Sequence, residues 1–355
     1  GYYSRISGDE FLVFVDVCPD RAAVEALFEQ FRAALDATMM AAPDGKTLKV
    51  RASMGMSFYP QDATDYAHLR EYADFAMYLA KSSRKGDLYA FDRASYEEKS
   101  FIVNGKEDLN RLLEEELVDY HFQPIVDMRV GEVVAYEALM RSRMESIPTP
   151  DRVLELARSQ SKLYRVEHLT FFGALDAFSR YPDAHDATLF VNSIATQRLS
   201  SDDELVLFER YPELLKHLVI EITESDYSRE MALYKEALAR RFGARRAIDD
   251  FGSGFNGETA LLDYHVDFVK IDMDIVRDID IMRDHQDIAR NLITYAHDRG
   301  IRIIAEGIET EAELRALHEL GADYAQGFLT GRPAPEPRDI DDDVKPLIRS
   351  LGTRR

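Results

Sequence analysis

The sequence predicts an α/β protein in which a (β/α)8, TIM-like barrel follows a smaller, partial α+β domain. Five apolar runs in the second half of the chain end in acidic or amide residues, which are Asn192, Glu221, Asp249 with Asp250, Glu306 and Gln326. Helical stretches separate these runs, which is typical of buried parallel strands. Because polar residues follow so many different strands, a closed barrel with one shared mouth is favoured over an open sheet.

The first part of the chain alternates short strands with amphipathic helices, a pattern typical of an α+β domain. We predict two strands around a turn over residues 4–17, a helix over 22–38, a strand over 48–60 and a second helix over 66–84. This domain is expected to cover residues 1–95. A charged linker helix over residues 96–112 then leads into the barrel.

The barrel domain is predicted to cover residues 113–338. Its first two strands should form a hairpin with a turn at Arg129–Glu132. Two later helices end at Gly243 and Gly321, and glycine is well suited to the residue after a helix. Residues 339–355 are expected to form a C-terminal tail that packs loosely or frays, because it follows a proline-rich segment and begins with acidic residues.

Composition narrows the class of protein. The 355 residues suggest two domains, and 46% are hydrophobic, enough for a core in each. No apolar stretch approaches the roughly 20 residues that span a membrane, and no secretory signal is present. A formal charge of −21 argues against non-specific DNA binding, and the lone Cys18 cannot form an internal disulfide. We therefore expect a cytoplasmic segment without membrane contact.

The acids at the strand ends predict a metal site. Four or five carboxylates that converge without neutralising bases would repel one another strongly in a low-dielectric cleft, and divalent cations would relieve that repulsion. The nine histidines lack zinc-binding spacings, and oxygen ligands suit Mg²⁺ or Mn²⁺. Any one of these acids alone could instead be a helix cap or a rim ion pair, so the prediction depends on the whole set.

Seven motifs resemble, in order, the motif set of EAL-domain cyclic di-GMP phosphodiesterases. They are YEALMR at 136–141, FVNSI at 190–194, IEITES at 220–225, AIDDFGSGF at 247–255, VKID at 269–272, AEGIET at 305–310 and YAQGF at 324–328. Upstream, SGDEF at 7–11, ASMGMSFYP at 52–60 and ADFAMYLAK at 73–81 resemble the C-terminal half of a GGDEF domain, the module of diguanylate cyclases. The resemblance is to a GGDEF-EAL protein whose earlier elements would precede residue 1 and could tether it to a membrane.

The resemblance implies a metal-binding and catalytic role for seven residues. Those that match the family's metal ligands, with Asp249 placed to bridge two ions, are Glu137, Asn192, Glu221, Asp249 and Asp250. Lys270 and Glu306 match positions near the attacking water, and they are the expected catalytic residues together with Glu137. The general base is left open between Lys270, Glu306 and a water activated by the metals.

Other matching positions border the substrate or support the site. Arg141 matches a phosphate-contacting arginine, Gln123 lies in the strand that borders the nucleotide, and Gln326 matches a residue that helps hold solvent or metal there. Glu309 matches a supporting acid, and Glu224 matches the acid that anchors the loop after the paired aspartates.

The resemblance implies hydrolysis of cyclic di-GMP to linear pGpG with two ions of Mg²⁺ or Mn²⁺, in bacterial second-messenger signalling, by a homodimer that pairs through its barrels. Two alternatives stay open. A receptor would bind cyclic di-GMP without cutting it, although such receptors usually lose several metal acids and this chain keeps all of them. A diguanylate cyclase would need the first half of the GGDEF domain, which this sequence lacks.

Overall fold

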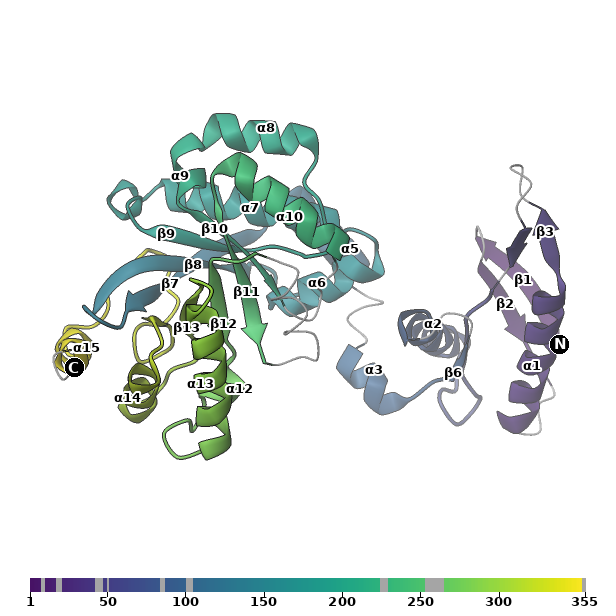
Figure 1. The fold of residues 1–355 in the computed structure, drawn as a ribbon. Helices are drawn as coiled ribbons and strands as arrows, with labels where there is room; N and C mark the ends of the chain where they lie inside the picture. Colours follow the sequence, from purple (N-terminus) through teal and green to yellow (C-terminus); the bar gives the residue numbers. More distant parts are fainter. Residues whose placement is uncertain are drawn as a thin grey trace. The chain divides into compact units, whose positions relative to one another are not determined.

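The computed structural model describes residues 1–7, 10–16, 21–41, 47–49, 51–83, 87–99, 105–223, 229–252 and 265–352. The chain forms two compact units, Gly1–Lys106 and Glu107–Arg355, each with its own sheets and helices (Figure 1). Cys18 lies outside the described residues. In the part of the chain that is described, none of the helices is both long and apolar enough to cross a membrane.

The first unit contains three two-stranded sheets among its described residues. Strands β1 (Tyr2–Ser7) and β2 (Glu10–Phe14) are antiparallel, as are β3 (Met39–Ala41) and β4 (Thr47–Lys49), whereas β5 (Met54–Met56) and β6 (Leu88–Ala90) are parallel. The helices are α1 (Arg21–Ala37), α2 (Tyr66–Ser83) and α3 (Arg93–Lys99). The single strand predicted over residues 48–60 is wrong, because β4 ends at Lys49 and β5 pairs in a different sheet.

Helix α2 packs directly on β5 because Gly55 leaves no side chain between them. A Cβ atom at Gly55 would lie 2.0 Å from the carbonyl oxygen of Ala73 and 2.1 Å from the backbone nitrogen of Met77. Phe75 and Ala76, which lie on the same helix, are completely buried. The first unit therefore has a small apolar core of its own between this helix and the β5–β6 sheet.

The second unit is a closed barrel of eight strands, which confirms the predicted fold. In chain order the strands are β7 (Val118–Asp127), β8 (Glu132–Ser142), β9 (Thr188–Asn192), β10 (Leu218–Thr223), β11 (Arg245–Phe251), β12 (Phe268–Ile271), β13 (Arg302–Ala305) and β14 (Tyr324–Ala325). Strands β8 to β14 run parallel to their neighbours, whereas β7 is antiparallel to both β8 and β14. The predicted hairpin causes this exception, because a short turn reverses the chain between β7 and β8 and Gly131 takes a positive φ of 67° there.

Helices surround the barrel (Figure 1). They are α5 (Lys106–Glu114), α6 (Pro150–Ser159), α7 (Leu163–Ser179), α8 (Ser201–Arg210), α9 (Pro212–Lys216), α10 (Arg229–Phe242), α12 (Met273–Val276), α13 (Arg283–His297), α14 (Glu311–Leu320) and α15 (Val344–Gly352), with a 3-10 turn at Pro182–Ala184. The predicted glycine caps are confirmed, since Gly243 follows α10 with a φ of 71° and Gly321 follows α14 with a φ of 100°. The predicted linker region contains α3 and α5, with residues 100–104 between them outside the described residues.

The described part of the C-terminal tail packs as a helix over Val344–Gly352, contrary to the prediction. Helix α15 buries Val344, Ile348 and Leu351 against the barrel unit. Arg349 on its outer face forms an ion pair with Glu132 at the start of β8. The prediction relied on the acidic stretch before this helix. It overlooked the apolar residues that follow at intervals of three and four positions, which is the spacing of one helix face.

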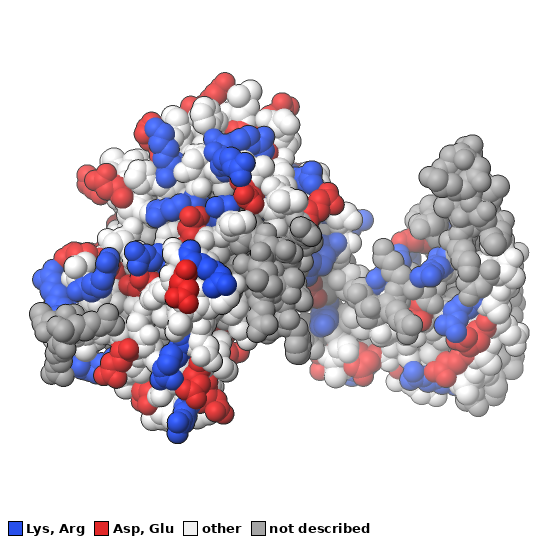
Figure 2. Space-filling view, viewed as in Figure 1, with Lys and Arg blue, Asp and Glu red and all other residues white. Residues whose placement is uncertain are grey.

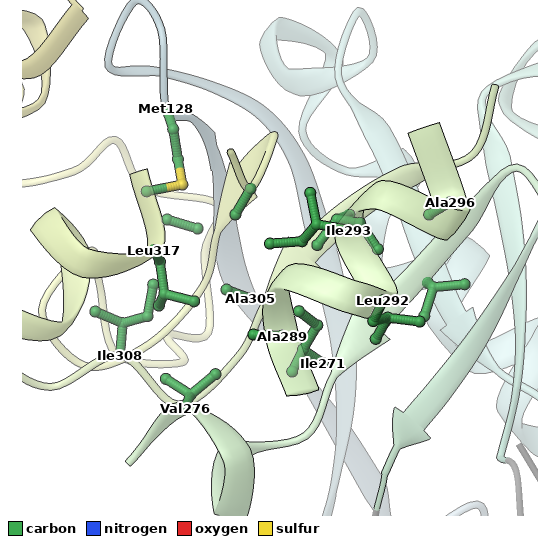
Figure 3. Close-up of a cluster of buried hydrophobic side chains, with 14 of the residues drawn as sticks. Met128, Ile271, Val276, Ala289, Leu292, Ile293, Ala296, Ala305, Ile308 and Leu317 are labelled. Carbon is green, nitrogen blue, oxygen red and sulfur yellow. The ribbon is translucent and has the colours of Figure 1, made fainter. Parts of the chain in front are cut away.

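The largest core cluster lies between the barrel and the helices that follow β12 and β13. Figure 3 shows some of its side chains; most come from β12, β13 and helices α12 to α14, among them Ile271, Val276, Leu292, Ile293 and Leu317, and Met128 follows β7. This close-packed core supports the ends of β12 and β13.

On the face of the barrel unit drawn in Figure 2, described Lys and Arg side chains lie among Asp and Glu side chains and do not form a continuous basic surface.

Candidate active site

The site follows directly from the alternation of side chains along the barrel strands. One layer of buried apolar side chains fills the barrel interior; it contains Ile125, Ala135, Phe190, Val219, Ala247, Phe268 and Ile304, with Tyr324 packed against it. On each strand, the residue two positions nearer the mouth is polar; this second layer contains Gln123, Glu137, Asn192, Glu221, Asp249, Lys270, Glu306 and Gln326. Since residues two apart share one face of a strand, the polar layer stands directly on the apolar layer.

Lys270 lies at the centre of this polar layer. Its ammonium nitrogen is 3.2 Å from Glu137 Oε2, 2.9 Å from Glu221 Oε1, 3.1 Å from Asp249 Oδ1 and 2.7 Å from Glu306 Oε1. The acids therefore do not converge without a neutralising base, which corrects one premise of the metal prediction. One ammonium against four carboxylates still leaves the cluster with a surplus of negative charge.

Amide side chains orient Glu137. Asn192 donates from Nδ2 to Oε1 of Glu137 at 2.8 Å, and Gln326 donates from Nε2 to Oε2 at 2.6 Å. Gln123 lies opposite Glu137 in the β7–β8 pairing, and its Oε1 is 3.3 Å from Gln326 Nε2. Both oxygens of Glu137 are therefore held in place, one by the last residue of β9 and one by the residue that follows β14.

Burial, neighbouring charges and hydrogen bonds together set the direction of each pKa shift in the cluster. Burial raises the pKa of Glu221 and of Glu306 well above the usual range, and the neighbouring carboxylates add to that shift. Burial alone would raise the pKa of Glu137 too, but the charge of Lys270 and the bonds from the two amides outweigh it and lower that pKa. Burial disfavours the charge of Lys270, yet the carboxylates around it raise its pKa well above the usual value.

Asp250 stands beside this cluster in a conformation that few residues other than glycine adopt. Its φ is 54°, in the left-handed region. Burial and the adjacent Asp249 raise its pKa to about 6. Asp272, at the end of β12, adds to this shift, although its own carboxylate caps α12 by accepting from the backbone nitrogen of Asp274 at 2.7 Å.

The cluster has the chemistry of a divalent-cation site. Two triads of carboxylates, Glu137 with Glu221 and Asp249, and Asp249 with Asp250 and Glu306, each bring one oxygen per residue within 4.8 Å of the others. Asp249 belongs to both triads. Oε2 of Glu221 is completely buried and, among the described residues, receives no hydrogen bond. Such an orphaned carboxylate oxygen in an all-oxygen donor set fits a hard cation.

Arg141 and Glu309 are not among the residues that contact Lys270. Arg141 is four residues beyond Glu137 on β8, and its guanidinium donates to the carbonyl oxygen of Met140 at 2.9 Å. Glu309 is half exposed, and its carboxylate forms an ion pair with Arg277 at 4.0 Å. Glu224 lies outside the described residues.

Sequence reasoning missed three buried polar residues behind β9. Ser193 follows Asn192, and it contacts Glu167 of α7 and Lys235 of α10. One signal was available in the sequence, because Glu167 is four residues from Leu163 and four from Phe171, on the apolar face of its helix.

Two family models match the chain. The EAL domain matches residues 106–333, and the diguanylate cyclase GGDEF domain matches residues 1–87. A curated relative, the cyclic di-GMP phosphodiesterase NbdA of Pseudomonas aeruginosa, is 28% identical over 98% of this chain and 46% of its own length. The chain spans about half the length of the curated relatives it matches.

Solved structures share the barrel. The PaMucR phosphodiesterase in complex with cyclic di-GMP is 28% identical, with a TM-score of 0.58, over 64% of this chain and 96% of that chain. The Klebsiella pneumoniae protein BlrP1, in a complex with calcium and cyclic di-GMP, is 25% identical, with a TM-score of 0.56, over 70% of this chain and 68% of that chain.

Proposed function

The chain belongs to the EAL domain family, and we propose that its barrel hydrolyses cyclic di-GMP to the linear dinucleotide pGpG with two ions of Mg²⁺ or Mn²⁺. One observation carries this proposal more than any other. Two carboxylate triads share Asp249 at the barrel mouth, and four carboxylates surround the single ammonium of Lys270. A protein that binds the nucleotide without cutting it has no evident need for such a cluster.

The reaction adds one water molecule across a phosphodiester. The hydroxyl joins phosphorus, the bond from phosphorus to the 3′ oxygen breaks, and the proton goes to that leaving oxygen, which yields a 5′ phosphate and a 3′ hydroxyl. Cations held by Glu137, Asn192, Glu221, Asp249 and Asp250 would supply water activation and charge neutralisation. The remaining chemistry belongs to the chain's own side chains.

Lys270 and Glu306 are assigned separate roles in the reaction. An ammonium surrounded by four carboxylates stays protonated, so we assign Lys270 the role of stabilising negative charge and holding Glu306, 2.7 Å away. We assign Glu306 as the carboxylate that accepts the proton of the attacking water, because it lies in one triad with Asp249 and Asp250 and is held by Lys270. We assign Arg141 and Gln123 to the phosphate and nucleotide.

The wider setting follows from the family and stays a proposal. We propose that the chain acts in the cytoplasm as a homodimer in cyclic di-GMP signalling, with the GGDEF region as a second, regulatory or synthetic, module. Sedimentation of the full chain tests the dimer, and a monomer at micromolar concentration would contradict it.

The decisive experiment incubates the chain with cyclic di-GMP and Mg²⁺ or Mn²⁺ and resolves the products by chromatography. We expect pGpG as the first product, and we expect little turnover with Ca²⁺, a larger ion that tolerates irregular coordination. Asp249→Asn serves as the inactive control. GMP as the sole early product, or equal rates with Ca²⁺ and Mg²⁺, would contradict the proposal. Tight binding of cyclic di-GMP without turnover would make the barrel a receptor.

A further inference from the structure

A second buried ion pair lies outside the carboxylate cluster, between two helices and the end of β9. Glu167 on α7 and Lys235 on α10 are both 0% exposed, and Nζ of Lys235 is 2.6 Å from Oε1 of Glu167. The two helices lie near each other against the barrel (Figure 1). Unlike the central cluster, this pair contains one charge of each sign and is balanced.

Both oxygens of Glu167 bind the residues that follow Asn192. Ser193 donates its hydroxyl to Oε1 at 2.7 Å, and the backbone nitrogen of Ile194 donates to Oε2 at 2.7 Å. Lys235 donates to the Ser193 hydroxyl as well, at 2.7 Å. The carboxylate therefore fixes two consecutive residues, Ser193 through its side chain and Ile194 through its backbone.

These residues connect the ion pair to the site. The backbone nitrogen of Ser193 donates to the carbonyl oxygen of Glu221 at 2.9 Å. One residue earlier, the amide of Asn192 donates to Glu137 at 2.8 Å. The backbone immediately after Asn192 is thus held from outside the barrel by Glu167, while the side chain of Asn192 points inward at a proposed metal ligand.

Stability alone does not explain why this pair is buried. Replacing a buried ion pair with apolar residues of similar volume is often neutral or stabilising, because two charges must lose their water. Hydrogen bonds to a charged group are, however, short and strongly directional. Residues that orient metal ligands also commonly change metal affinity by about 10- to 100-fold.

We propose that Glu167, supported by Lys235, is a positioning residue that sets the orientation of Asn192 for metal binding. This inference rests on the proposed metal site, but not on turnover. Glu167 contacts neither the substrate nor the reacting atoms. It acts through the hydroxyl of Ser193 and the backbone nitrogen of Ile194, which hold the chain immediately after β9.

The test is direct Mn²⁺ binding to the full chain, measured by titration calorimetry without substrate, beside the melting temperature of the metal-free protein. Glu167→Met combined with Lys235→Met removes both charges at similar volume. We expect the Kd for Mn²⁺ to rise at least about tenfold, while the melting temperature of the metal-free protein changes by only a few degrees. A role in folding alone would change the melting temperature and leave the Kd unchanged.

Two further variants keep the inference testable if the double variant does not fold. Ser193→Ala removes one hydroxyl and should raise the Kd for Mn²⁺ at least about threefold, below the full effect of losing the carboxylate. The matched control is Glu204→Gln, because Glu204 also binds α10, through Arg241 at 2.6 Å and Tyr234 at 2.9 Å, but lies on α8. Its Kd for Mn²⁺ should stay within about twofold of wild type.

The outcomes separate this inference from the proposed function. Wild-type Mn²⁺ affinity in both the double variant and Ser193→Ala, or no Mn²⁺ binding by the wild type, would overturn the positioning role. If the wild type binds Mn²⁺ and these variants bind it more weakly, but no variant or wild type cuts cyclic di-GMP, the positioning role stands and the proposed phosphodiesterase activity fails.

Discussion

Two buried lysines of the barrel unit, Lys270 and Lys235, differ in what surrounds them. Lys235 faces one carboxylate, and the ammonium, the carboxylate and a serine hydroxyl form a closed hydrogen-bonded set. Lys270 faces four carboxylates, and one oxygen of Glu221 receives no hydrogen bond from any described residue. Both lysines are 0% exposed.

The comparison shows which buried charged groups are balanced by the protein alone and which are not. A balanced, hydrogen-bonded pair needs no added cation, which agrees with the positioning role that we propose for it. A cluster with surplus negative charge is electrostatically costly by itself, and added cations reduce that cost. The same side chain thus lies in a balanced pair in one place and in a cluster with surplus negative charge in the other, and the neighbouring residues decide which.

The largest expected effect is on the free energy of unfolding when either buried lysine is replaced, and Mn²⁺ should distinguish the two variants. Lys235→Met leaves Glu167 as an uncompensated buried carboxylate and should lower the free energy of unfolding by about 3–5 kcal/mol. Lys270→Met should lower it by a similar amount without metal. At one fixed Mn²⁺ concentration, 100 times the Kd of Lys270→Met, that variant should regain about 2.7 kcal/mol, whereas Lys235→Met should regain less because it binds Mn²⁺ more weakly once Asn192 is misplaced. Urea unfolding with and without Mn²⁺ measures both. Equal recovery in the two variants would contradict the comparison.

A smaller effect is expected on the rate of hydrolysis. Glu137→Ala or Asp249→Ala should lower the rate at least about a hundredfold, equivalent to about 2.7 kcal/mol of transition-state stabilisation, because each removes a carboxylate that the cations need. Asp176→Asn, which changes an exposed ion pair with Arg180, is the control and should leave the rate unchanged. Initial rates of pGpG formation provide the measurement. Activity of either alanine variant within threefold of wild type would refute the assignment.

A third prediction concerns the cost of surplus charge. Burial raises the pKa of Glu221 in the folded chain, so the folded state binds more protons than the unfolded state and loses stability as pH rises above the unfolded pKa. Glu221→Gln removes that ionisation and should raise the free energy of unfolding of the metal-free protein by about 1 kcal/mol at pH 8. The gain should be smaller at pH 5. A variant that is less stable than wild type at pH 8 would show that ionised Glu221 does not destabilise the folded, metal-free protein.

The smallest effect should come from an exposed pair. Arg349→Ala removes the ion pair between α15 and Glu132, whose side chains are 56% and 49% exposed. Water and salt screen such pairs, so the free energy of unfolding should fall by less than about 1 kcal/mol. Thermal unfolding in low salt is the suitable measurement. A loss as large as that of Lys235→Met would remove the distinction between buried and exposed pairs.

The sequence by itself determined the barrel and the composition of its mouth. Apolar runs that end in Asn192, Glu221, Asp249 and Glu306 predict strands whose polar ends converge, because the alternation of side chains along a strand is a local property and a strand-helix repeat is typical of a parallel barrel. The glycine after each of two helices and the hairpin before the barrel are local signals as well. Recognisable motifs then supplied the expected role of each residue.

Only the tertiary structure decided which charges meet. Glu167 and Lys235 lie on different helices, and no local periodicity indicates that they pair behind Asn192. The same holds for Lys270, whose position at the centre of four carboxylates depends on the closure of strands β8 to β13. Helix α15 also depends on tertiary contacts, because a helix this short is stable only when its apolar face packs against the barrel. Contacts between residues far apart in the chain are set by packing, and packing exists only in the folded molecule.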